Sequence, residues 1–172
     1  MPWEVSMRRH TRFYGLIAFF LAVFASATGA RAQEWREYTA ADYGFSMLIP
    51  AGTKMATREF GGGWGGLVGE HEGTSVIGVA KLGTQEQAAD IEAFGVSVTG
   101  IPAARWTLID EGAGNGWKWY RTVSAKEGSK QVFGGYGVGP RGSYLLILVT
   151  TPEDFGAYRS DFDAWYESIK LF

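Results

Sequence analysis

Short segments in which apolar and polar residues alternate make up most of the chain after residue 33. Segments of this kind, rich in aromatic and β-branched residues and separated by Gly, Pro, Asn and Asp, are typical of β-strands. They predict strands over 35–39, 45–49, 55–60, 65–71, 75–81, 106–111, 117–125, 131–138 and 143–150. Tight turns are expected at Asp42-Tyr43-Gly44 and at Glu72-Gly73-Thr74.

Two of the predicted strands have patterns that say more about their surroundings. Residues 144–149 (YLLILV) contain no polar position, so we expect a central strand that is covered on both faces. Residues 117–125 alternate. One face of that strand would carry Trp117, Trp119, Arg121 and Val123, with both Trp side chains in the core. The glycine-rich segment 112–116 is expected to be a turn or loop.

Two helices interrupt the strands. The first is predicted to begin at Thr84, which stands in capping-box spacing with Gln87, and to end before Gly95. The second is predicted to begin after an N-cap at Thr151, with Pro152 in its first turn. Its large apolar residues follow at helical spacing and should form one stripe on the sheet: Phe155, Tyr158, Phe162, Trp165 and Ile169. Locally paired strands with these two helices predict an antiparallel α+β sandwich.

The first 32 residues have the pattern of a signal peptide. Three arginines precede an apolar run of 13 residues over 13–25, and Ala30-Arg31-Ala32 follows with small residues at the positions that a signal peptidase requires. We therefore expect an exported, periplasmic or secreted protein that is cleaved after Ala32 and does not insert into the membrane afterwards. The alternative is an uncleaved anchor, because 13–30 carries no charge over 18 residues.

A single α+β domain is expected over residues 33–172. The chain has no cysteine, so this domain must form its core without disulfides. Residues 1–32 hold four of the 16 basic and one of the 18 acidic residues, which leaves the mature part with a net charge of −5. That balance argues against nucleic acid as a partner and against electrostatic docking on anionic lipid.

The order of the predicted elements resembles that of the PsbP/DcrB-like group of exported proteins. The opening EWREYTAADYGFSMLIPAG has the short strand, turn and G-F-S-x-x-x-P strand of that group, and 114–172 has its paired strands, apolar strand and helix ending in Ser-Ile-x-x-Phe. The resemblance implies an antiparallel sheet between helices. It also implies a binding or assembly role, since the group includes photosystem extrinsic subunits, a Ran-binding nuclear factor and bacterial periplasmic proteins.

The segment FGGGWGG (60–66) places Gly61, Gly63 and Gly66 at the G-x-G-x-x-G spacing of a dinucleotide-binding loop. Such a loop needs a buried strand before it and a helix that begins at its third glycine. Here the polar segment KMATREF precedes the glycines and a strand pattern follows them. We therefore expect a glycine-rich hairpin or bulge, with no nucleotide or other cofactor.

No metal ligand or catalytic residue is assigned. Glu70, His71 and Glu72 have suitable chemistry for a metal, but consecutive residues of a strand point to opposite faces. The same argument separates the carboxylates of Asp110 and Glu111. His71 is the only histidine after cleavage, and the chain has no G-x-S-x-G motif.

Trp64 is the aromatic residue that core packing explains least, because glycines surround it. Exposed, it would contact a partner; folded back, it would close the edge of the sheet. We expect a contact residue, with Gly63, Gly65 and His71 as further binding residues. This predicts a non-catalytic protein-binding or assembly module with a partner in the cell envelope. The alternative is a binder of a small ligand such as a carbohydrate, or a hydrolase, with an aromatic-lined cleft near Trp64.

Export predicts a defined mature N-terminus. When the full-length chain is produced in a host that secretes it, intact-mass spectrometry should find a protein that begins at Gln33, because the cleavage pattern ends at Ala32. A full-length product recovered in the membrane fraction would instead support the uncleaved anchor.

Overall fold

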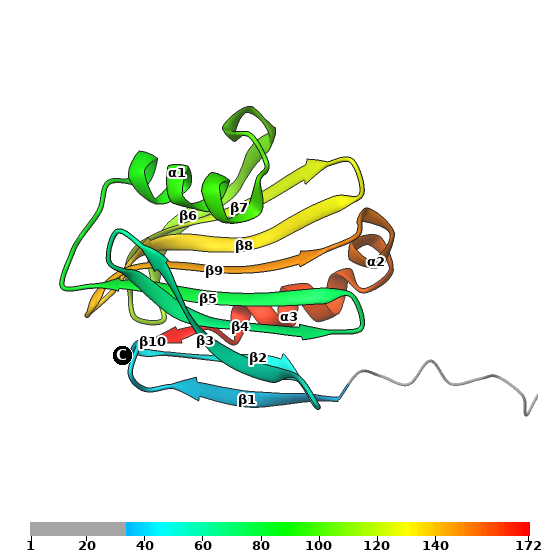
Figure 1. Ribbon diagram of the computed structural model, residues 1–172, viewed down its shortest axis with the longest axis horizontal. Helices are drawn as coiled ribbons and strands as arrows, with labels where there is room; N and C mark the ends of the chain where they lie inside the picture. Colours follow the sequence, from blue (N-terminus) through cyan, green and yellow to red (C-terminus); the bar gives the residue numbers. More distant parts are fainter. Residues whose placement is uncertain (1–33) are drawn as a thin grey trace, which may run out of the picture. The chain divides into compact units, whose positions relative to one another are not determined.

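The computed structural model describes residues 34–172, which form two antiparallel sheets and three α-helices (Figure 1). The predicted signal peptide and its cleavage site lie outside the described residues. The strands are β1 Trp35–Ala40, β2 Phe45–Pro50, β3 Lys54–Gly61, β4 Trp64–His71, β5 Thr74–Leu82, β6 Trp106–Gly114, β7 Trp117–Glu127, β8 Lys130–Val138, β9 Gly142–Thr150 and β10 Lys170–Leu171. The helices are α1 Ala88–Thr99, the 3₁₀ turn η1 Ala103–Arg105, α2 Pro152–Ala157 and α3 Arg159–Glu167.

Seven strands form the main sheet, in the order β3-β4-β5-β9-β8-β7-β6. Helix α1 packs on one face of this sheet, while α2, α3 and a small sheet of β1, β2 and β10 cover the other face. The predicted α+β fold, an antiparallel sheet flanked by helices, is thereby confirmed. The sequence did not indicate that β1 and β2 would leave the main sheet and pair with the C-terminal strand β10.

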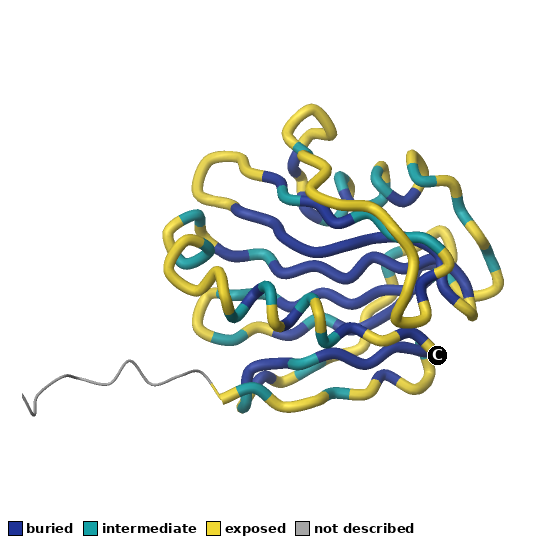
Figure 2. Tube along the Cα trace, turned by 180° about the vertical axis from the view of Figure 1, so that it is seen from behind, coloured by how far each residue is buried: buried dark blue, intermediate teal, exposed yellow. Residues whose placement is uncertain are grey.

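Strand β9 lies in the middle of the main sheet, between β5 and β8, as its apolar pattern predicts. Tyr144, Leu146 and Leu148 face the core beneath the small sheet and α3, whereas Leu145 and Ile147 face α1. Figure 2 shows the central strands as the buried part of the domain. The side chains of β9 therefore join the two hydrophobic cores, one on each face of the main sheet.

Helix α1 begins and ends later than the capping signals predict. It starts after Gln87 and runs through Gly95 to Thr99, and Gly100 ends it in a left-handed conformation with φ 72°. Thr84 does not cap the helix, because Gln87 is the N-cap residue. The Thr84 carbonyl accepts a hydrogen bond of 2.9 Å from the Ser143 hydroxyl. Gly95 lies inside the helix, and it packs against the Trp106 ring, because a Cβ there would come within 2.7 Å of that ring.

The C-terminal helix is divided in two, which the continuous apolar stripe did not predict. The N-cap at Thr151 is confirmed, since its hydroxyl accepts the Asp154 N–H at 3.1 Å. The helix breaks at Tyr158, whose side chain is 48% exposed and not on the sheet as expected. Arg159 occupies the space beside the sheet, with its guanidinium 5.2 Å from the Phe133 ring centroid and 5.0 Å from that of Phe155.

The rest of the stripe packs as predicted. Phe162, Trp165 and Ile169 are buried under the main sheet, and Phe155 is half-buried beside them.

Within residues 34–172, none of the helices has both the length and the apolar composition that a membrane span requires.

A bulge in β7 separates the two Trp side chains that were expected on one face. Gly114 pairs with Trp117 and Gly112 with Tyr120, so β7 has one residue more than β6 between these two pairs. The extra residue reverses the alternation. Trp117 therefore packs in the core beneath the small sheet, and Trp119 lies on the α1 face. Strand β6 also continues through Gly114, although a loop was expected there.

The segment FGGGWGG forms the hairpin between β3 and β4, as predicted. Gly62 and Gly63 are its two central residues, with φ angles of 61° and 84°, which a type I′ turn requires and glycine adopts without strain. The turn directs Trp64 inward, and the side chain is only 5% exposed. Its ring stacks on Phe94 of α1 at a centroid distance of 4.1 Å and an interplanar angle of 5°. The expectation that the loop presents Trp64 to a partner is therefore wrong.

The position of Trp64 makes the indole a structural anchor for α1. Trp64→Ala should lower the free energy of unfolding by about 3–5 kcal/mol, because it leaves a cavity beneath Phe94. Urea unfolding measures this loss, and Leu82→Ala at a 40% exposed site is the control, with an expected loss below about 1 kcal/mol. An equally small loss for Trp64→Ala would show that the ring is not held under the helix.

Candidate functional site

The structure does not bring the predicted binding residues together. Gly63 is exposed at the turn, Gly65 is buried within β4, and Trp64 is covered by α1. His71 lies at the other end of β4, seven residues from Trp64, which is roughly 23 Å along a strand. A shared binding site for these four residues is therefore not formed by the hairpin.

His71 is half-buried, and its Nε2 atom lies 4.0 Å from the Glu72 carboxylate. Glu72 is itself part of the turn between β4 and β5, with a φ of 48°. Within the part of the chain that the structure describes, no three His, Cys, Asp or Glu side chains are grouped closely enough to hold a metal ion.

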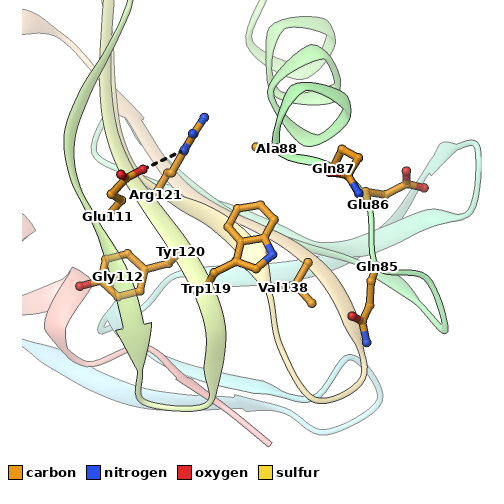
Figure 3. A pocket seen from close by; sticks show the side chains of 10 residues that line it. All are labelled: Gln85, Glu86, Gln87, Ala88, Glu111, Gly112, Trp119, Tyr120, Arg121 and Val138. Atoms are coloured by element: carbon orange, nitrogen blue, oxygen red, sulfur yellow. Dashed lines mark hydrogen bonds and ion pairs between the residues drawn. The ribbon is translucent and has the colours of Figure 1, made fainter.

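A cleft of about 610 Å³ lies beside the start of α1. It lies between the segment that leads into α1 and the hairpin of β6 and β7. Figure 3 shows the Trp119 ring among the lining residues, with the Arg121–Glu111 pair on one side and the approach to α1 on the other. The lining residues are Gln85, Glu86, Gln87, Ala88, Glu111, Gly112, Trp119, Tyr120, Arg121 and Val138.

The cleft exists because one helix covers only part of a wide sheet. Seven strands span roughly 29 Å at about 4.8 Å for each interval. Helix α1 is only about 10 Å in diameter, and it packs on β8 and β9 near the middle. The sheet face over β6 and β7 is therefore left without a covering helix. Trp119 is half-buried on this uncovered face rather than sealed in a core.

A row of polar contacts crosses the floor of this region from α1 to the edge strand β6. The Tyr136 hydroxyl donates a hydrogen bond of 2.9 Å to Glu92 of α1. Arg121 lies beside the same hydroxyl, and its Nε atom donates to Glu111 of β6 at 3.3 Å. Burial raises the pKa of the Tyr136 hydroxyl, and Glu92 raises it further, while Arg121 lowers it. Because the net effect is upward, Tyr136 keeps its proton at neutral pH and remains a donor to Glu92.

The opposite wall of the cleft is fixed to the sheet by side-chain hydrogen bonds. The Glu86 backbone N–H donates to the Ser143 hydroxyl at 2.8 Å, and the Glu86 carboxylate pairs with Lys81 of β5. These contacts hold the approach to α1 against β5 and β9. Gln85 and Gln87 are exposed on either side of Glu86, so their amides are available at the mouth of the cleft.

This arrangement is suited to recognition. The half-buried aromatic surface of Trp119 offers apolar contact, and the amides and charged groups around it offer oriented hydrogen bonds. Glu86 pairs with Lys81 and Glu111 with Arg121, so both carboxylates at the cleft are held in ion pairs. Tyr120 points its hydroxyl to Asp110 at 3.2 Å, and burial together with Asp110 raises its pKa, which keeps this phenol neutral.

One feature of the sequence indicates this cleft. Arg121 interrupts an otherwise apolar face of β7, between Trp119 and Val123. A charged residue at such a position indicates that part of the face is open to solvent. The glutamines before α1 gave no signal, because the helix was expected to begin at Thr84.

The sequence matches no protein-family model and no curated protein. Among solved structures, the solution structure of cyanobacterial PsbP (CyanoP) from Synechocystis sp. PCC 6803 is similar, with a TM-score of 0.58 and 15% sequence identity over 86% of this chain and 98% of that chain. The Ran-binding protein Mog1p of Saccharomyces cerevisiae aligns with a TM-score of 0.43 and 11% identity over 81% of this chain and 96% of that chain. The similarity to CyanoP confirms the expected resemblance at the level of the fold: this chain has a PsbP-like fold.

Proposed function

We propose that this protein is a non-catalytic binding module of the cell envelope, which holds a segment of another envelope protein in the cleft between α1 and the β6–β7 hairpin. Export rests on the signal pattern of residues 1–32. Binding rests on one observation above all, an open cleft whose half-buried aromatic floor lies among paired charges and exposed amides. Gly63, Gly65 and His71 lie elsewhere, and a binding role for them stays a prediction.

The edge strand next to the cleft extends the surface available to a partner. Leu108 is 50% exposed and Ile109 47% exposed, and both belong to β6. Leu108 pairs with Val123, so it lies on the same face of the sheet as Glu111 and Arg121. Apolar contacts beside a polar rim are the usual composition of a protein interface, and Trp and Arg are the residues most often found at its energetic centre.

Site-specific photocrosslinking in envelope-containing cells tests this proposal. A photoreactive phenylalanine in place of Gln87, at the cleft mouth, should form an adduct with a discrete envelope protein. The same residue in place of Lys126 should not, because Lys126 lies five residues beyond Arg121 along β7. Trp119→Ala in the Gln87-substituted chain should lower the adduct yield by about tenfold, since it removes the apolar floor.

A folding control accompanies this experiment, because Trp119 is half-buried. Arg121→Glu changes the charge of the cleft without removing the aromatic floor, and it should also reduce the adduct, since it sets two carboxylates against each other at Glu111. Both variants should unfold cooperatively in urea. Equal adduct yields from positions 87 and 126, or yields that neither variant changes, would contradict the proposal.

A carbohydrate is the second candidate ligand, and the composition of the cleft floor favours it specifically. The cleft volume of about 610 Å³ lies within the range of about 300–1,000 Å³ for small-molecule sites. An aromatic ring with neighbouring amides and carboxylates can stack on one sugar ring and bond its hydroxyls. Trp119 lines this cleft and Trp64 does not, so in this proposal Trp119 would provide the aromatic contact.

Calorimetric titration with soluble fragments of envelope polysaccharide separates the two candidates. The protein-binding proposal predicts no heat at millimolar sugar. Saturable heat that Trp119→Ala abolishes, together with a lack of protein adducts, would assign the cleft to carbohydrate instead.

A further inference from the structure

A second hollow of about 200 Å³ lies on the other side of α1, over β3, β4 and β5. Its apolar side chains are Phe60, Val68, Ile77, Phe94 and Val98, and the polar side chains of Arg58 and Ser97 complete the lining. We propose that this apolar pocket binds one large apolar side chain of a partner protein, with an acidic residue next to it in the partner that pairs with Arg58.

The walls of the apolar pocket are held in place before any ligand arrives. Phe94 is fixed from below by the stacked Trp64 ring at 4.1 Å. Phe60 meets the same Phe94 edge-on, at a centroid distance of 6.0 Å and an angle of 87°. The buried Ile77 of β5 forms the floor. A preformed pocket spares a ligand the free-energy cost of ordering its walls.

The volume of the pocket is suited to a single side chain and is small for a complete small-molecule ligand. Small-molecule sites usually enclose about 300–1,000 Å³, and this pocket is below that range. Partner proteins, however, commonly place one large apolar or aromatic side chain into a small pocket of this kind. Phe60, Val68, Phe94 and Val98 are all half-buried, so they still have apolar surface that such a side chain would remove from water.

The positive charge of Arg58 at the rim favours acidic residues next to the inserted side chain in the partner. Arg58 is exposed, and its guanidinium lies 5.2 Å from the Phe60 ring centroid. None of the ion pairs formed within residues 34–172 includes Arg58. Glu59, the next residue in β3, lies against Gly65. A carboxylate in the partner would therefore find a cation beside the pocket.

The apolar pocket and the cleft are separate sites, because α1 stands between them and they share no lining residue. The pocket also differs in chemistry. Its side chains are aliphatic and aromatic apart from Arg58 and Ser97, whereas the cleft also has amides and carboxylates. Failure of either proposal would therefore leave the other standing.

Methyl NMR of the purified protein, titrated with short peptides, tests the proposal. The probe is acetyl-Glu-Leu-Glu-amide, and the matched probes are acetyl-Lys-Leu-Lys-amide and acetyl-Glu-Ser-Glu-amide. The first should shift the methyl signals of Val68, Ile77 and Val98 in a saturable way. The second should bind at least about fivefold more weakly because of its charge, and the third because it lacks the apolar side chain.

Two variants with matched controls assign the effect to the pocket. Arg58→Glu should weaken the first probe by about fivefold or more, while Lys54→Glu, the same charge reversal elsewhere in β3, should not. Ser97→Trp should block the pocket, while Ala89→Trp, on an exposed part of α1, should leave binding unchanged. All four substituted residues are exposed, so all four variants should fold.

The proposal is overturned if the three peptides shift the same methyl groups with equal affinity, or if none of them shifts these groups at about 10 mM. Shifts confined to residues of the cleft would overturn it as well. Binding that survives Ser97→Trp would show that the leucine side chain of the probe does not enter the pocket.

Discussion

The structure depends on one geometric constraint, the need to cover both faces of a seven-stranded sheet with few elements. Strand β9 is apolar on both sides, so water must be excluded above and below it. The face under β1, β2, α2 and α3 is covered across most of its width. On the opposite face the 12-residue helix α1 covers the middle of the sheet, and one hollow lies on each side of it. Both proposed sites therefore lie where α1 leaves this face of the sheet uncovered.

The local pattern of the sequence predicted most of the strands and their turns, because apolar and polar residues alternate along a strand and glycines mark the turns between strands. The residues 144–149 even predicted a central position in the sheet. Features that depend on how two strands pair, such as β-bulges, were not predictable from the pattern of one strand. The bulge that separates Trp117 from Trp119 is a mismatch between β6 and β7, and it leaves no mark in either strand alone.

The candidate site was predicted less well than the fold, for a physical reason. Trp64 stood out because its sequence neighbours are small, yet its real neighbour is Phe94, thirty residues away on a helix that packs over the hairpin. Whether an aromatic side chain is exposed is decided by such distant contacts. The cleft around Trp119 likewise arises from the limited width of α1, which no single residue encodes.

The docking of the C-terminal residues onto β2 has a consequence for the order of folding. Lys170 and Leu171 pair with Ser46 and Phe45, and the Ser168 hydroxyl accepts the Leu48 N–H at 2.9 Å. At least 120 positions separate these partners along the chain, so a long loop must close before they meet. Until then the apolar strand FSMLIP has an unpaired edge, which is a template for association with other chains. A chain whose main sheet formed before its last five residues docked would therefore present this edge to other chains.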